Sequence, residues 1–179
     1  MESHSDTSIK NERKYMAATS PVPRFVRVAN VLTKTLLRAG VNLVGFGRHP
    51  TYLLTVRGRK SGELRTTPVS VVERDGKRYL FAPYGVVNWV RNLRAAGAAT
   101  LTRGRRAEAI RAIELPNDEA GLVLKAFIES GNPMGRYFGV TMESSREEFE
   151  RTTIGHPVFL LQSVDAAISG AAGQIRPVR

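Results

Sequence analysis

The strongest constraint on the fold of this chain is a pair of strand-like runs on either side of Asp75-Gly76. The runs 67–74 and 77–82 are rich in β-branched or aromatic residues, and Asp-Gly between two such runs is the sequence signature of a tight β-hairpin. A second pair of runs, 99–103 and 106–115, flanks Gly104 in the same way. Because hairpins join neighbouring antiparallel strands, the sequence predicts an antiparallel sheet rather than βαβ units.

The remaining elements add a strand at each end and helices between the strands. Residues 51–57 (TYLLTVR) predict a buried strand before the first hairpin, and residues 157–163 (PVFLLQS) predict a last strand. This order predicts an α+β fold, an antiparallel sheet or barrel with peripheral helices. Three helices are predicted. The first covers 88–96 and ends at Gly97, and the second covers 118–130 with Asn117 as its N-cap. The third is short and begins with a capping box of Ser144 and Glu147.

The two ends of the chain differ in composition from this central part. Residues 1–23 lack an apolar run, which predicts a flexible tail without a signal peptide and therefore a cytoplasmic protein. Residues 24–47 predict an amphipathic helix with its basic residues on one side, which either packs on the core or touches an anionic membrane peripherally through residues 25–46. Residues 48–165 form the predicted folded domain, and the Gly/Ala-rich residues 166–179 a C-terminal tail.

The charge of the chain is concentrated in its middle. The chain holds 27 Lys and Arg against 16 Asp and Glu, a formal net charge of +11. Residues 48–111 alone contain 14 basic and 4 acidic residues, a difference of +10. Such a segment indicates a polyanionic partner, either a nucleic acid, an anionic membrane or a ligand with phosphates or carboxylates. Nucleic acid is disfavoured because the segment has no interleaved exposed aromatics and no reader motif.

Several kinds of chemistry are excluded by residue type. The chain has no Cys and three isolated His, so we expect no metal site and no cysteine nucleophile. His49 and His156 each precede a proline, which is typical of turns. No paired carboxylates suggest a general acid and base. An enzyme with this sequence would depend on a cofactor to supply the reactive group.

The clearest candidate for a binding motif is the turn Gly58-Arg59-Lys60-Ser61-Gly62, which follows strand 51–57. Its two glycines allow a sharp turn that exposes backbone N–H groups, and Arg59, Lys60 and the nearby Arg65 add positive charge. Charge-assisted hydrogen bonds from such a set favour a phosphate. The alternative is a solvated basic hairpin turn.

The stretch LLTVRGRKSGELRTTPVSVVERDGKRYLFAPYG, followed by NWVRNLRAAG, resembles the deazaflavin-dependent nitroreductase family of actinobacteria. The resemblance covers roughly residues 50–163, and a last strand that includes Thr152, Thr153 and Pro157 resembles the family's closing segment. It implies a split β-barrel and reduced coenzyme F420, a deazaflavin with a phosphodiester and an oligoglutamate tail. The implied reaction passes a hydride to a small electron-poor acceptor such as a quinone, an enone or a nitroaromatic.

The resemblance also implies roles for individual residues. It assigns the contacts with the phosphate and the tail to Arg59, Lys60 and Ser61, and the contacts that line the deazaflavin ring to Arg65, Thr66, Thr67, Pro68 and Val69. It places Ala82, Pro83, Tyr84 and Gly85 beside the ring. Trp89 and Asn92 belong to a helix that faces the site. Trp89 could equally be a plain core residue. Asn92 is a poor residue for a helix interior, which favours a functional role.

The sequence departs from the family's pattern on the acceptor side of the site. Pro83-Tyr84 replaces the family's serine, so we expect Tyr84 to supply the hydroxyl and Tyr137 to act as a lid residue. These two residues are the predicted catalytic pair. Two alternatives stay open at this point, an FMN-dependent oxidoreductase on the same barrel and a non-catalytic protein that binds a deazaflavin or a lipid. The sequence says nothing about the oligomeric state.

Overall fold

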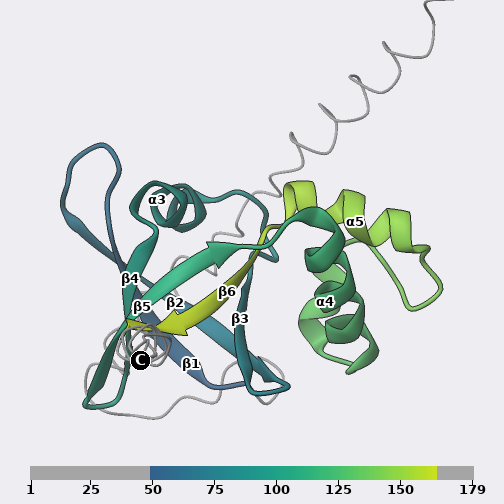
Figure 1. Ribbon diagram of the computed structural model, residues 1–179, viewed down its shortest axis with the longest axis horizontal. Helices are drawn as coiled ribbons and strands as arrows, with labels where there is room; N and C mark the ends of the chain where they lie inside the picture. The colour runs from purple at the N-terminus through teal and green to yellow at the C-terminus, as the bar shows by residue number, and fades with distance from the viewer. Residues whose placement is uncertain (1–48, 165–179) are drawn as a thin grey trace, which may run out of the picture.

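Six antiparallel strands close into a barrel in the order β1-β2-β3-β6-β5-β4 (Figure 1). The computed structural model describes residues 49–164. Because β1 pairs with both β2 and β4, the barrel leaves no free sheet edge among these strands. The prediction of an antiparallel barrel with peripheral helices is confirmed. The strands are β1 (Thr51–Arg57), β2 (Leu64–Arg74), β3 (Lys77–Phe81), β4 (Ala98–Arg103), β5 (Arg106–Glu114) and β6 (Val158–Ser163).

The helices occupy two sides of the barrel. Helix α3 (Asn88–Ala96) lies across one end of it, and α4 (Asn117–Glu129) and α5 (Arg146–Gly155) lie together outside β3 (Figure 1). A short 3-10 helix, η2 (Pro133–Tyr137), connects α4 to the loop before α5. It falls in a Gly/Pro-rich stretch for which the sequence predicted no helix.

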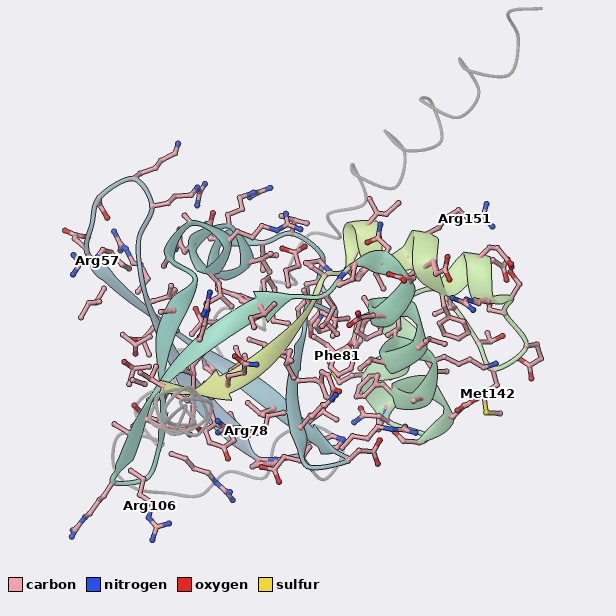
Figure 2. The ribbon with its side chains drawn as sticks, viewed as in Figure 1. Arg57, Arg78, Phe81, Arg106, Met142 and Arg151 are labelled. Atoms are coloured by element: carbon pink, nitrogen blue, oxygen red, sulfur yellow. The ribbon has the colours of Figure 1, made fainter. Side chains whose placement is uncertain are left out.

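Alternation along the strands divides the apolar residues between two cores. Leu80 of β3 points into the barrel with Leu54 of β1, and Val90 and Leu93 of α3 close that core at one end. The neighbours of Leu80 in β3, Tyr79 and Phe81, belong to a second core under α4 and α5, as successive side chains of a strand point to opposite faces. Figure 2 shows Phe81 between β3 and α4, where its ring stacks on Phe127 at 4.5 Å.

Strand β2 begins earlier than predicted. Its pairing with β1 extends from Ser70 to Leu64, which lies opposite Arg57. The sequence placed the start at residue 67. In the structure Leu64 and Arg65 are exposed and Thr66 is half-buried. Cross-strand pairing, rather than burial, therefore extends this hairpin beyond the barrel.

Of the three predicted helix starts, that of α3 is confirmed, and those of α4 and α5 are corrected by one residue. Helix α4 begins at Asn117 itself with Pro116 as N-cap, and the Asn117 Oδ1 accepts a hydrogen bond from the Thr153 hydroxyl instead of capping. The capping box of α5 consists of Ser145 and Glu148, because the Ser144 hydroxyl accepts from the Thr141 N–H.

The closing segment is also corrected. Thr152 and Thr153 lie in α5, and β6 begins only after Pro157. Thr153 is buried and donates to the Glu150 carbonyl, a bond within one helical turn. Its hydroxyl also lies 3.3 Å from the Asn117 Oδ1 of α4, so Thr153 is part of the contact between α4 and α5.

The predictions for both ends of the chain lie outside the described residues. They concern the tail 1–23, the helix 24–47 with its membrane contact through residues 25–46, and the tail 166–179, so the proposed limits of the domain, 48–165, stay a prediction. Among residues 49–164, no helix is long and apolar enough to cross a bilayer.

Helices α4 and α5 approach closely at Gly121. A Cβ built on this residue would lie 3.0 Å from the Glu150 backbone nitrogen and 3.2 Å from its Cα. We expect Gly121→Ala to lower the free energy of unfolding by about 1–3 kcal/mol through overpacking, although alanine is the better helix former by roughly 1 kcal/mol. Urea denaturation would measure this, with the exposed neighbour Leu122→Ala as the control. A Gly121→Ala protein as stable as the parent would show that α5 can move away.

Candidate active site

An open cleft of about 720 Å³ lies between the turn that joins β1 to β2 and helix α3. It brings together eight of the residues singled out from the sequence. Gly58 of the predicted turn also lines it. Leu64 and Asn88 were not predicted, and Leu64 is 68% exposed there. The predicted residues in the lining are Arg59, Lys60, Ser61, Arg65, Thr66, Thr67, Trp89 and Asn92.

The turn owes its shape to hydrogen bonds within the hairpin. The Gly58 N–H donates to the Glu63 carbonyl and the Gly62 N–H to the Gly58 carbonyl, both at 2.8 Å. Gly62 has φ +71°, a left-handed conformation that favours glycine. The Arg57 guanidinium donates to the Gly62 carbonyl at 2.8 Å and ties the turn to the end of β1. Residues 59–61 are therefore held out at the rim of the cleft.

Asn92 links this turn to helix α3. Its side-chain oxygen accepts from the Arg59 backbone N–H at 3.3 Å and from the Arg59 guanidinium at 3.0 Å. Asn92 is 6% exposed, and a buried amide oxygen without such donors would be costly. This contact explains an asparagine inside a helix and sets the orientation of Arg59.

The cleft is positively charged. The described residues that line it include Arg59, Lys60 and Arg65 and no carboxylate. Arg65 pairs with Glu63 at 2.6 Å, but both side chains are more than half exposed, and such surface pairs contribute little. An anion can therefore compete for Arg65, and the cleft is suited to a ligand with several negative charges.

The inner part of the cleft is bounded by β2 and Trp89. Trp89 lines the cleft and also packs against the barrel core, with its ring 6.1 Å from that of Phe159, so the two roles considered for it coexist. Val69 is placed differently from the prediction, because its side chain is part of the barrel core. Pro68, opposite Leu53 in the pairing of β1 with β2, is not among the lining residues either.

The predicted stretch 82–85 forms a tight turn directly after β3. The Gly85 N–H donates to the Ala82 carbonyl at 2.9 Å, and Gly85 has φ +74°. Pro83 stands at the second position of this turn, where its restricted φ is favourable. None of residues 82–85 lines the cleft, but residues 86 and 87 connect the turn directly to Asn88 and Trp89, which do.

Tyr84 and Tyr137 meet although they come from different parts of the chain. Their ring centroids are 5.2 Å apart in an edge-to-face arrangement. Burial raises the pKa of the Tyr84 hydroxyl, and the contact with Tyr137 adds to this effect. Arg136, which the sequence did not single out, donates to the Tyr137 hydroxyl at 3.1 Å. No sequence signal pointed to Arg136, because its contact depends on the fold of η2.

The family resemblance implies coenzyme F420 as the ligand of this cleft, and we expect Asn92→Ala to weaken its binding without unfolding the protein. Loss of the amide frees Arg59 to adopt orientations away from the cleft, and one charge-assisted hydrogen bond is worth about 1.5–3 kcal/mol. Fluorescence titration with F420 would measure the change. The matched control is Asn132→Ala, because Asn132 is also a buried asparagine but caps η2. Equal affinities for parent and Asn92→Ala would show that the orientation of Arg59 does not matter.

A family model described as F420H(2)-dependent quinone reductase matches residues 30–147. An F420H2-dependent reductase from Mycobacterium smegmatis is 26% identical, with 63% of this chain and 93% of that chain covered and a TM-score of 0.44. A chain described as a domain-swapped dimer is also 26% identical, with 77% and 97% covered and a TM-score of 0.47.

A solved F420 reductase is 13% identical, with 73% of this chain and 92% of that chain covered and a TM-score of 0.41. No match was found among the curated proteins. The family model spans residues 30 to 147, which is 118 of the 179 residues and thus well over half of the chain. The chain therefore belongs to the F420H2-dependent quinone reductase family and is an F420H2-dependent oxidoreductase with coenzyme F420 as its hydride donor.

Proposed function

We propose that the cleft between the β1–β2 turn and α3 binds the phosphodiester and the glutamate carboxylates of coenzyme F420. The observation that carries this proposal is the anchored cation at its rim, Arg59 held by Asn92. Lys60 adds a mobile charge and Ser61 a hydroxyl donor on the same lining. The donor set fits the group, because phosphate and carboxylate oxygens accept charge-assisted hydrogen bonds and this lining offers guanidinium, ammonium and hydroxyl donors.

The deazaflavin ring would be held by the inner part of the same cleft. Thr66 and Thr67 of β2 and Trp89 of α3 line this part of the cleft. Val69 would contribute only its backbone, since its side chain fills the barrel core. The turn 82–85 would then lie on the side from which an acceptor approaches.

Coenzyme F420 in its reduced form supplies the hydride, and the chain supplies the charge stabilisation. Burial raises the pKa of the Tyr84 hydroxyl above its ordinary value, which already lies far above neutral pH, so the hydroxyl is protonated and can donate a hydrogen bond to the acceptor oxygen on which negative charge develops. Tyr137 packs against Tyr84, and its hydroxyl accepts a hydrogen bond from Arg136. The tyrosine pair therefore lies next to a positive charge. This pair is the proposed catalytic part of the site.

Quinones and enones are the acceptors that this arrangement favours. Both carry an oxygen that becomes an anion after hydride transfer. The edge-to-face pair of Tyr84 and Tyr137 places two rings where the family resemblance implies a small serine, which narrows the approach. We propose that flat conjugated acceptors fit better than bulky bicyclic nitroaromatics.

Lys60→Ala is expected to weaken F420 binding about tenfold or more, because each lost charge-assisted bond is worth roughly 1.5–3 kcal/mol. The binding should also weaken with salt. Fluorescence titration with F420 and, in parallel, with FMN measures both the affinity and the cofactor preference. Lys125→Ala, an exposed lysine of α4, is the control for loss of charge alone. Equal loss in both variants, or FMN binding as tight as F420 binding, would contradict the proposal.

Tyr84→Phe is expected to lower kcat about 100-fold while leaving F420 affinity unchanged, because the hydroxyl acts only as charge develops on the acceptor. Steady-state rates with menadione and with cyclohexenone test this in the presence of saturating F420H2. Tyr52→Phe, at the opposite end of β1 near Arg103, is the matched control. If Tyr84→Phe turns over both acceptors at the parent rate, the Tyr84 hydroxyl has no part in the reaction.

A further inference from the structure

His156 lies where the two segments that carry the tyrosines come together. It follows α5 directly, as the C-cap of that helix, and is 8% exposed. The sequence indicated only a turn residue before a proline. In the structure its imidazole touches the turn 82–85 on one side and the residue after η2 on the other.

The first contact fixes the turn that carries Tyr84. The His156 Nδ1 is 3.0 Å from the Ala82 carbonyl oxygen. A carbonyl can only accept, so Nδ1 carries the proton and donates. The same carbonyl accepts the Gly85 N–H that closes the turn, and the Ala82 N–H donates to the Pro157 carbonyl at 3.2 Å. Both backbone groups of Ala82 are thus held by His156 and Pro157.

The second contact fixes the segment that carries Tyr137. The imidazole packs on the Phe138 ring with 5.3 Å between centroids. Phe138 is 4% exposed, and its N–H donates to the Gly135 carbonyl at 3.0 Å, which closes η2. Tyr137 is the preceding residue, so any movement of Phe138 relative to Ala82 changes the distance between the two tyrosines.

We propose that His156 is a positioning residue that sets the geometry of the Tyr84–Tyr137 pair and thereby of the acceptor pocket, an inference that rests on the proposed function of that pair. One imidazole contacts both segments, by a hydrogen bond to the Ala82 carbonyl and by its ring contact with Phe138, and so supports the direct ring contacts Tyr84–Tyr137 and Phe81–Phe138. Burial lowers the pKa of His156, so the ring is neutral at neutral pH and its single proton stays on Nδ1. A neutral ring with one fixed donor is suited to holding a geometry rather than to transferring a proton.

The test compares His156→Leu, which keeps apolar volume but loses the donor, with His156→Asn, which keeps an N–H donor near the position of Nδ1. His49→Leu is the matched control, because His49 also precedes a proline but its ring lies tilted against Phe127, with 6.3 Å between centroids, rather than against Phe138. The readouts are F420 affinity, kcat and KM with menadione, and the Tyr84 ionisation followed by NMR of tyrosine labelled with carbon-13 at Cζ. The Tyr84 resonance is assigned by its loss in Tyr84→Phe.

His156→Leu should lower kcat about 10- to 100-fold, the effect of a small misplacement of a reacting group, with F420 affinity unchanged. The pKa of Tyr84 should fall toward its ordinary value as the pair opens, and His156→Asn should restore both the rate and the pKa. If His156→Leu does not fold, His156→Asn carries the test, with near-parental kcat and Tyr84 pKa expected.

An unchanged Tyr84 resonance in a folded His156→Leu protein overturns the proposal, as does a His156→Asn protein that folds but shows no recovery of the Tyr84 pKa. A change caused equally by His49→Leu would also overturn it. Failure of this proposal can be told apart from failure of the proposed function. If the Tyr84 hydroxyl has no part in the reaction, Tyr84→Phe keeps the parent rate, whereas the positioning role of His156 is measured by the resonance of Tyr84.

Discussion

The pairing of β1 with two partners is the interaction on which the site depends. β1 bonds to β2 along its whole length and to β4 through residues 53–55, which closes the barrel and fixes the direction of the β1–β2 hairpin. The hairpin then extends past the barrel end, where α3 packs across the core through Val90 and Leu93. The cleft exists because these two elements leave the barrel at the same end, and the bond between Arg59 and Asn92 joins them. At the other side of the barrel, Arg78, Glu108 and Ser163 tie β3, β5 and β6 together.

The basic residues of one sequence segment lie in different parts of the structure. The basic segment 48–111 indicated a polyanionic partner. In the structure, Arg78 and Arg94 are neutralised by Glu108 and Glu114, and Arg106 is at the tip of the β4–β5 hairpin, far from the end of β1 at Arg57 (Figure 2). The net charge of a segment counts residues that lie at different ends of the folded molecule. A bound ligand interacts mainly with the few charged residues that line its own cleft.

The predictions were wrong at the starts of α4 and α5, where a shift of one residue along the chain changes which side chain caps the helix. The capping box predicted at Ser144 is at Ser145, and Asn117, predicted as an N-cap, bonds to Thr153. Adjacent residues of similar chemistry compete for such positions, and packing of α4 against α5 selects between them. The same limit applies to the acceptor side. The sequence pointed to Tyr84 and Tyr137 separately. Their contact with each other, and the contacts of Arg136 and His156 beside them, form because the fold brings η2 and the end of α5 next to the turn after β3.

The sequence by itself determined the hairpins, the antiparallel barrel and the basic turn 58–62, because these depend on local features, namely alternation along strands, Asp-Gly and Gly turns, and charge beside glycines. Eight of the candidate site residues, chosen from these features and from the family resemblance, line one cleft. Only the tertiary structure decided the side of β2 that Val69 faces, the partner of Asn92 and the two contacts of His156. These relations join residues far apart in the chain, and a hydrogen bond or a ring contact forms only after closure of the barrel has brought its partners within a few ångströms.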